Sequence, residues 1–322
     1  MVACCLQPVG EGLDAGSPNA VTDAGACAFV DAGWKVEVLG GNLAGPWFED
    51  ADAGIFLDAL GVALGQDGGL FISSVLDAQI VSLEPLASIM QLPPLSWPVA
   101  LAVLPDSSFA VLCTGELDSS GGGVAIVAPD GTTRLKVPIL GNRFGPSGTI
   151  AWGRDHSLYA VVDGNADVYV VHLDGTYADV PLQSSAPASL AATPDGGILL
   201  AVGCQVLEFD PASGSTTVVA GQAARCQVVD GNGTSAAFGG PIAMAFAPSG
   251  NLYVLDPDYS SGSLAVRRMT PDGTVETVAS FPPCAQPSPL GINPSQIAVS
   301  SSGIYFANTE WIGELVPPAG SL

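Results

Sequence analysis

Short apolar runs alternate along most of this chain with turns rich in Gly, Pro, Asp and Asn. The clearest example spans residues 242–256, where the apolar run IAMAF is followed by the turn APSGN and then by LYVLD. Apolar runs of this length that are bounded by turn residues predict β-strands.

The same order of apolar run, turn and apolar run recurs along the chain, and a small residue marks each copy. Successive copies lie 39 to 54 residues apart, and the marking residues are Ala63, Ala102, Ala151, Ala191, Ala245 and Ala298. Strand-rich repeats of this size predict the blades of a β-propeller. A small side chain suits the innermost strand of a blade, because the inner strands converge on one axis.

Each copy divides into four strands except the last, which ends after three. The predicted innermost strands are Leu60–Leu64, Val99–Leu104, Thr149–Gly153, Ser189–Thr193, Ile242–Phe246 and Gln296–Ser300. The missing strand is found near the other end of the chain, at Trp34–Leu39. We therefore predict an all-β fold in residues 33–322, a six-bladed β-propeller of four-stranded antiparallel blades. An amino-terminal strand completes its last blade, and this closure removes an open sheet edge.

Residues 218–280 contain, in order, VVAG, Asp230-Gly231, Pro241, GNLYV, Asp256 and the turn PDG. This stretch resembles an NHL-repeat propeller unit, and the resemblance extends more weakly over residues 34–322. It implies a propeller fold. Members of that family bind proteins or RNA or serve as sensor ectodomains, and relatives include lyases and lactonases, so the resemblance leaves the function open.

Charged residues are few and unbalanced, with 31 Asp and Glu against 8 Lys and Arg and a net charge of −23. The negative charge disfavours nucleic acid and anionic lipid surfaces as partners, because both are bound through clustered Lys and Arg. It also favours a soluble monomer, although the mean hydropathy is +0.42. No apolar run approaches the roughly 18 residues that a membrane-spanning helix needs.

Residues 1–32 are predicted to form a flexible tether, because they are small, polar and interrupted by Gly and Pro. Ala3 before Cys4 resembles the end of a bacterial lipoprotein signal, in which that Cys carries a lipid anchor. The charged and apolar regions of a signal peptide are missing. The alternative is a disordered tail with incidental cysteines.

Two of the seven cysteines are predicted to pair. Cys204 ends the second strand of the fourth copy, and Cys226 lies in the long loop that leaves the same copy. A disulfide between them requires an oxidising compartment and so favours an extracytoplasmic protein. The alternative is one buried and one exposed free thiol. Cys113 is expected to be a buried small apolar residue.

Loops from the second to the third strand, and from one blade to the next, share one face of a propeller, which we name the loop face. It is expected to gather Asp77, Glu116, Asp118, Asp163, Asn165, Asp256, Asp258, Asn308 and Glu310. The candidates for ligand binding among them are Asp163, Asn165, Asp256, Asp258, Asn308 and Glu310.

Asp163, Asn165 and Asp167 have the spacing of the first half of a calcium-binding loop. A Ca²⁺ ion is therefore one candidate cofactor, because it prefers several oxygen ligands. Val168 stands where such a loop needs Gly, and no Glu closes it. The alternative is an ordinary polar turn.

Other catalytic chemistry finds little support. His156 is expected in a turn on the opposite face and His172 at a strand end, so no multi-histidine zinc site is expected. This argues against the amidating-lyase branch of the resemblance. The sequence has no GxSxG elbow, P-loop or dinucleotide-binding fingerprint. Trp97 and Trp311 are expected to pack between blades rather than to anchor a ligand.

These observations favour a non-catalytic binding or scaffold propeller outside the cytoplasm, which takes a protein or a small ligand on its loop face. The alternative is a metal-dependent, calcium-type hydrolase or lactonase of the gluconolactonase-like class, using Asp163, Asp256 and their neighbours. No position-specific motif of that class matches. RNA binding is disfavoured, since 8 basic residues face 31 acidic ones.

Overall fold

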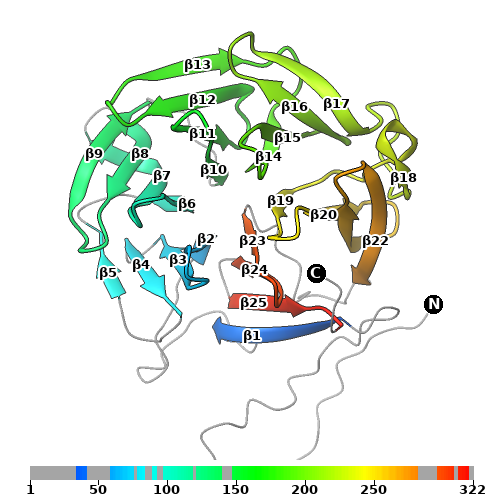
Figure 1. Ribbon diagram of the computed structural model, residues 1–322, viewed down its shortest axis with the longest axis horizontal. Helices are drawn as coiled ribbons and strands as arrows, with labels where there is room; N and C mark the ends of the chain where they lie inside the picture. Colours follow the sequence, from blue (N-terminus) through cyan, green and yellow to red (C-terminus); the bar gives the residue numbers. More distant parts are fainter. Residues whose placement is uncertain are drawn as a thin grey trace, which may run out of the picture.

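The protein is a ring of six antiparallel β-sheets, so the predicted six-bladed propeller is confirmed (Figure 1). The computed structural model describes residues 34–41, 59–75, 78–83, 89–92, 97–118, 121–139, 147–281, 296–307 and 311–318. The predicted tether 1–32, with Cys4, lies outside these residues, as do Asp77, Asn308 and Glu310. The described residues include no helix of the length and hydropathy needed to cross a bilayer.

The first three blades have four strands each, numbered from the centre of the ring outward. Blade one contains β2 (Ala59–Leu64), β3 (Leu70–Ser74), β4 (Gln79–Ser82) and β5 (Ile89–Gln91). Blade two contains β6 (Pro98–Val103), β7 (Phe109–Asp118), β8 (Gly121–Val127) and β9 (Thr133–Pro138). Blade three contains β10 (Gly148–Trp152), β11 (Ser157–Val162), β12 (Asp167–His172) and β13 (Tyr177–Pro181).

The remaining blades follow the same plan with one addition. Blade four contains β14 (Pro187–Ala192), β15 (Ile198–Val202), β16 (Gln205–Asp210) and β17 (Ser215–Gly221). Blade five contains β19 (Ala243–Phe246), β20 (Leu252–Asp258), β21 (Ser263–Met269), β22 (Thr274–Phe281) and an outer fifth strand, β18 (Gly231–Asn232). A short 3₁₀-helix, η1 (Gly233–Ser235), follows β18. The sequence pattern did not predict β18, because it has only two residues and no apolar run.

Blade six is closed as predicted by a strand from the beginning of the described chain. Its order is β23 (Ile297–Val299), β24 (Ile304–Ala307), β25 (Trp311–Val316) and then β1 (Lys35–Gly41). The strands β1 and β25 are antiparallel, with Lys35 opposite Val316 and Gly41 opposite Trp311. Trp34, directly before β1, is buried in the core between blades five and six.

The marking alanines lie on the strands nearest the centre, which are β2, β6, β10, β14, β19 and β23 (Figure 1). Apolar side chains of neighbouring blades pack against one another, as Leu112 of blade two does with Leu158 of blade three in one core cluster. The inner strands are also joined by Gln296, whose Nε2 donates to the Leu101 carbonyl at 2.7 Å. Its Oε1 accepts from the N–H groups of Leu101 at 3.0 Å and Val62 at 3.3 Å. One amide thus connects blades six, one and two.

Trp97 was expected to pack between blades, and this prediction is wrong. Its side chain is 55% exposed in the loop that precedes β6. The residue that begins the strand, Pro98, is buried instead, and Trp97 has a left-handed φ of 58° outside it. The side chain of Trp311 is outside the described residues.

Candidate functional site

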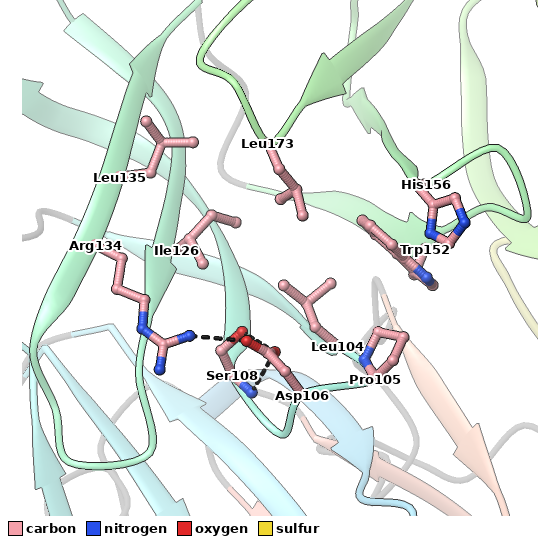
Figure 2. A pocket seen from close by; sticks show the side chains of 10 residues that line it. All are labelled: Leu104, Pro105, Asp106, Ser108, Ile126, Arg134, Leu135, Trp152, His156 and Leu173. Atoms are coloured by element: carbon pink, nitrogen blue, oxygen red, sulfur yellow. Dashed lines mark hydrogen bonds and ion pairs between the residues drawn. The ribbon is translucent and has the colours of Figure 1, made fainter.

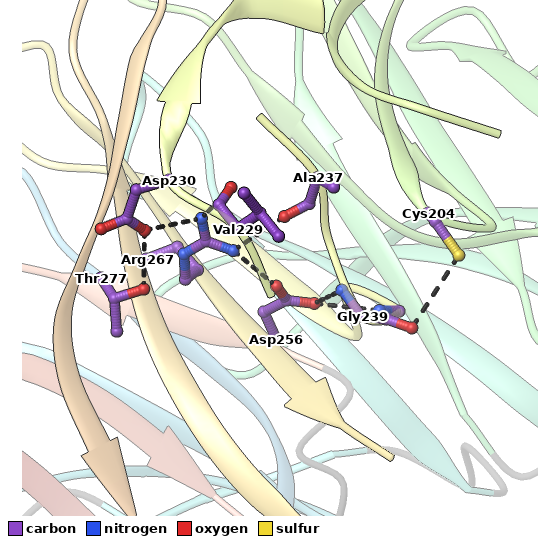
Figure 3. A network of polar contacts seen from close by, with 9 residues as sticks. Cys204, Val229, Asp230, Ala237, Gly239, Asp256, Arg267 and Thr277 are labelled. Atoms are coloured by element: carbon purple, nitrogen blue, oxygen red, sulfur yellow. Dashed lines mark hydrogen bonds and ion pairs between the residues drawn. The ribbon is translucent and has the colours of Figure 1, made fainter. Parts of the chain in front are cut away.

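A network of buried polar side chains lies beneath the loop face in blade five (Figure 3). At its centre is Arg267 on β21, whose side chain is fully buried. Its Nη1 lies 2.9 Å from Asp256 Oδ2 and donates to the Ala237 carbonyl at 3.1 Å. Its Nη2 donates to the Val229 carbonyl at 3.0 Å and to Asp230 Oδ1 at 3.1 Å. One guanidinium therefore holds strand β20 and two segments of the loop that enters blade five.

Asp256, a candidate ligand-binding residue, belongs to this network. It is fully buried, and its Oδ1 accepts from the N–H groups of Gly239 and Gly240, both at 2.9 Å. Burial raises the pKa of Asp256 to about 6, although these N–H groups and Arg267 act in the opposite direction. The carboxylate is thus ionised at neutral pH and directed at protein groups. In this structure Asp256 organises the fold and offers no atom to a ligand.

The predicted disulfide is present beside the network. Cys204, in the turn between β15 and β16, is bonded to Cys226 with a Cα–Cα distance of 5.2 Å. The bond attaches the loop after β17 to blade four, a few residues before Val229 and Asp230 contact Arg267. Cys113 is a buried free cysteine, as expected. The disulfide and the contacts of Arg267 therefore fix this loop at neighbouring places.

Replacing both bonded cysteines with Ala is expected to lower the free energy of unfolding by about 3 kcal/mol, because the bond closes a loop of 22 residues in the unfolded chain. Denaturant unfolding of the wild type with and without reductant measures the same loss. The C204A/C226A variant should not respond to reductant. If reductant lowers the stability of both proteins equally, the loss of stability comes from other cysteines.

The other loop-face candidates whose side chains the structure describes are exposed or half-buried, and the side chains of Glu116 and Asp118 lie outside that part. Asp163 is exposed, while Asn165 and Asp167 are half-buried at the start of β12. The Asn165 oxygen accepts from the Asp167 N–H at 3.1 Å, and its amide nitrogen donates to the Tyr169 hydroxyl. Among the described residues no three His, Cys, Asp or Glu side chains converge as metal ligands. The calcium loop and the loop-face ligand site both stay predictions.

Asp258 likewise stabilises its own loop. Its Oδ1 accepts from the Ser260 N–H at 3.0 Å, and its Oδ2 accepts from the Ser261 hydroxyl at 2.7 Å. The hydrogen bonds from the hydroxyl groups of Ser260 and Ser261 lower the pKa of Asp258. Beyond it the side chain of Tyr259 is 72% exposed.

A hollow of about 430 Å³ opens on the opposite face, between blades two and three (Figure 2). This face carries the turns from first to second and from third to fourth strands, and we name it the turn face. The hollow is lined by Leu104, Pro105, Asp106, Ser108, Ile126, Arg134, Leu135, Trp152, His156 and Leu173. Leu104, Ile126, Trp152 and Leu173 point toward one another in Figure 2. Its walls are therefore mainly apolar, and Leu173 is 49% exposed at the opening.

Polar groups occupy the border of the hollow. Arg134 Nη1 on β9 lies 2.7 Å from Asp106 Oδ2, and both side chains are about half exposed. Ser108 donates its N–H to Asp106 Oδ1 at 3.0 Å. The His156 ring lies edge-on to the Trp152 ring, with centroids 5.9 Å apart. The hollow thus combines an apolar interior with a carboxylate, a guanidinium and an imidazole.

Two residues at the hollow have a backbone conformation that favours glycine. The equivalent position of the turn after the innermost strand is Gly68, Gly196 and Gly250 in blades one, four and five, with φ between 84° and 88°. In blades two and three it is Ser107, with φ of 63°, and His156, with φ of 61°. A non-glycine residue in this region is unfavourable and is often retained for function. His156 lines the hollow, and Ser107 stands in the chain between the lining residues Asp106 and Ser108.

His156 lies, as predicted, on the face opposite the acidic loops, although no role was expected for it there. The hollow was not predicted, because its residues come from separate strands and turns of two blades. A comparison of the five equivalent turn positions would have indicated it, because only Ser107 and His156 depart from glycine there.

The fold defines this chain as a six-bladed β-propeller, and the resemblance to propellers of this class is confirmed at the level of the fold. No family model and no curated protein matches the sequence. Several solved structures share the fold. A structural-genomics protein of unknown function from Bacteroides thetaiotaomicron is 18% identical with a TM-score of 0.65, over 88% of this chain and 76% of that chain.

Two further similar structures have described functions. An auxiliary nutrient-binding protein from Bacteroides thetaiotaomicron is 14% identical with a TM-score of 0.59, over 88% of this chain and 76% of that chain. A gluconolactonase from Xanthomonas campestris is 13% identical with a TM-score of 0.58, over 92% of this chain and 94% of that chain. At these identities the likeness establishes the fold, which serves binding proteins and enzymes alike.

Proposed function

We propose that this propeller is an extracytoplasmic binding module that takes a small ligand into the hollow between blades two and three. The observation that carries the proposal is the hollow itself, with apolar walls and a few polar groups at its border. Its volume of about 430 Å³ lies within the range of small-molecule sites. The unfavourable backbone of Ser107 and His156 at the same place supports a functional role.

Two other observations support binding outside the cytoplasm. The disulfide between Cys204 and Cys226 is compatible with an oxidising compartment. Two structures of the same fold are described as auxiliary nutrient-binding proteins, from Bacteroides thetaiotaomicron and Bacteroides ovatus. The buried charged side chains of blade five, Asp256 and Arg267, form an ion pair with each other rather than pointing at a substrate.

The probe 4-phenylbutan-1-ol, a neutral aromatic alcohol, is expected to bind in the hollow. Titration followed by two-dimensional NMR should move the resonances of Trp152 and Leu173. Leu173→Trp places a larger side chain at the half-exposed opening and should therefore weaken binding. We expect the Kd to rise at least roughly fivefold, which corresponds to a loss of about 1 kcal/mol of binding free energy. The matched control is Tyr259→Trp, an aromatic substitution at an exposed residue of the loop face, which should leave binding unchanged.

A second pair of variants separates function from folding. His156→Gly and Ser107→Gly should leave the unfolding free energy unchanged or raise it by up to about 1 kcal/mol, because Gly accepts the left-handed conformation. His156→Gly should nevertheless weaken binding of the probe. A probe affinity that is unchanged in both Leu173→Trp and His156→Gly would overturn the proposal. Calcium-dependent hydrolysis of glucono-1,5-lactone would instead favour the hydrolase alternative.

A further inference from the structure

We propose that the ligand of the hollow is an electrically neutral molecule with an apolar body and a carbonyl-type hydrogen-bond acceptor, such as a ketone, an ester or an amide. This inference rests on the proposed function and adds the chemical class of the ligand. Three properties of the lining carry it: apolar walls, one ion pair that balances its own charge, and side-chain donors that have no protein acceptor.

The ion pair in the lining indicates a ligand without net charge. Among the described residues that line the hollow, the only Arg, Lys, Asp or Glu side chains are Arg134 and Asp106, which lie 2.7 Å apart. A ligand cation would have to compete with Arg134 for a carboxylate whose Oδ1 also accepts from the Ser108 N–H and hydroxyl. A ligand anion would meet a guanidinium that Asp106 already balances, in a protein with a net charge of −23. Neither kind of ion therefore finds an unbalanced partner in the lining.

Two side chains of the lining have hydrogen-bond donors to spare. Arg134 uses one of the five N–H groups of a guanidinium for Asp106, and none of the described residues accepts from the others. The half-buried Trp152 also lacks an acceptor for its indole N–H in the part of the chain that the structure describes, and its ring contact is with His156. An indole N–H that is buried usually finds a partner. These donors are therefore available to a ligand.

The main acceptors of the lining are, by contrast, already used. Asp106 accepts at both carboxylate oxygens, and the Pro105 carbonyl accepts from Gln66 Nε2 at 3.0 Å. A ligand that fills the hollow displaces water from the Arg134 and Trp152 donors, and a donor left without a partner weakens binding. A ligand acceptor removes this cost, whereas a ligand donor does not. The lining therefore favours a ligand that accepts hydrogen bonds.

The apolar walls fit the rest of such a ligand. Leu104, Ile126 and Leu173 supply aliphatic surface, and Trp152 supplies an aromatic ring (Figure 2). Burial of apolar ligand surface against these side chains favours binding, and a few polar groups fix the orientation of the ligand. An apolar body that presents a carbonyl oxygen to Arg134 meets both requirements.

Four probes that share a phenyl ring on a four-carbon chain test the inference: 4-phenylbutan-2-one, 4-phenylbut-1-ene, 4-phenylbutylamine and 4-phenylbutyrate. The ketone has an acceptor and no donor, the alkene has no hydrogen-bonding group, and the other two carry a charge. Calorimetry and NMR are carried out on the full chain at pH 8, above the usual titration range of histidine. The ketone should bind at least roughly fivefold more tightly than either charged probe.

The variant Arg134→Met separates the effect of the acceptor from that of the apolar body. It should weaken binding of the ketone roughly fivefold, because it removes the donors, and should not weaken binding of the alkene. The matched control is Arg154→Met, which removes the same charge from an ion pair with Asp195 on the same face, outside the lining of the hollow. This control should leave the affinity of both probes unchanged. Both arginine side chains are at least half exposed, so both variants should fold.

The outcomes separate the two proposals. Tighter binding of the amine or of the carboxylate than of the ketone would overturn the inference, as would an affinity for the ketone that is unchanged in Arg134→Met. In either case the hollow stays a binding site if Leu173→Trp weakens binding of the probes. If none of the four probes binds, both the inference and the proposed function are overturned.

Discussion

Removal of residues 1–41 is expected to make the protein aggregate, because it takes away β1 and leaves β25 as an open edge. It also removes Trp34, a buried side chain of the core between blades five and six. Loss of a buried Trp side chain alone costs about 3–5 kcal/mol. Light scattering after gel filtration, with circular dichroism, measures the result.

The matched control is removal of residues 1–32 only. If these residues are the predicted tether, the shorter protein should keep a cooperative unfolding transition and elute as the monomer we expect. The variant Trp34→Ala, which retains β1, should lie between the two in stability. A soluble, cooperatively folded protein after removal of 1–41 would show that pairing with β25 is not what closes the ring.

Arg267→Met is expected to lower the free energy of unfolding by about 3–5 kcal/mol, since it leaves the buried Asp256 carboxylate without its cation. It also removes the donors to the Val229 and Ala237 carbonyls, and so loosens the loop into blade five. Denaturant unfolding gives the change in stability. Hydrogen exchange should show faster exchange at Gly239 and Gly240.

Arg268→Met is the matched control on the same strand. Arg268 pairs with Glu276 at a partly exposed site, where ion pairs contribute up to about 1 kcal/mol. The Asp256→Asn, Arg267→Met double variant removes both charges and should be more stable than Arg267→Met alone. Equal losses for the Arg267 and Arg268 variants would contradict the role of the buried pair.

The strands could be predicted from sequence because each blade repeats one local pattern of apolar runs and turns. The closing strand could also be predicted, because a sheet with three strands implies a partner elsewhere. The outer strand β18 could not, since it depends on the Gly231 pairing with Val275 rather than on its own side chains.

The candidate site was less accessible to sequence reasoning. Asp256 follows an apolar run at the start of a loop, and this position suggests an exposed carboxylate. The carboxylate is instead buried, because it pairs with Arg267 on the neighbouring strand. The hollow depends on how two blades meet, since Leu104 and Trp152 belong to different blades. The local sequence pattern therefore predicts turns and strands well, but it does not predict which side chains meet between two blades.

The pairing of Lys35 with Val316 has a consequence for chain order. The first and last described strands lie side by side. The ring therefore does not determine at which blade the chain begins and ends. A circularly permuted gene, with a short linker from β25 to β1 and new ends in an exposed turn, should encode the same ring. The exposed turn between β16 and β17 belongs to blade four, outside the two blades that form the hollow, and is a suitable place for those ends.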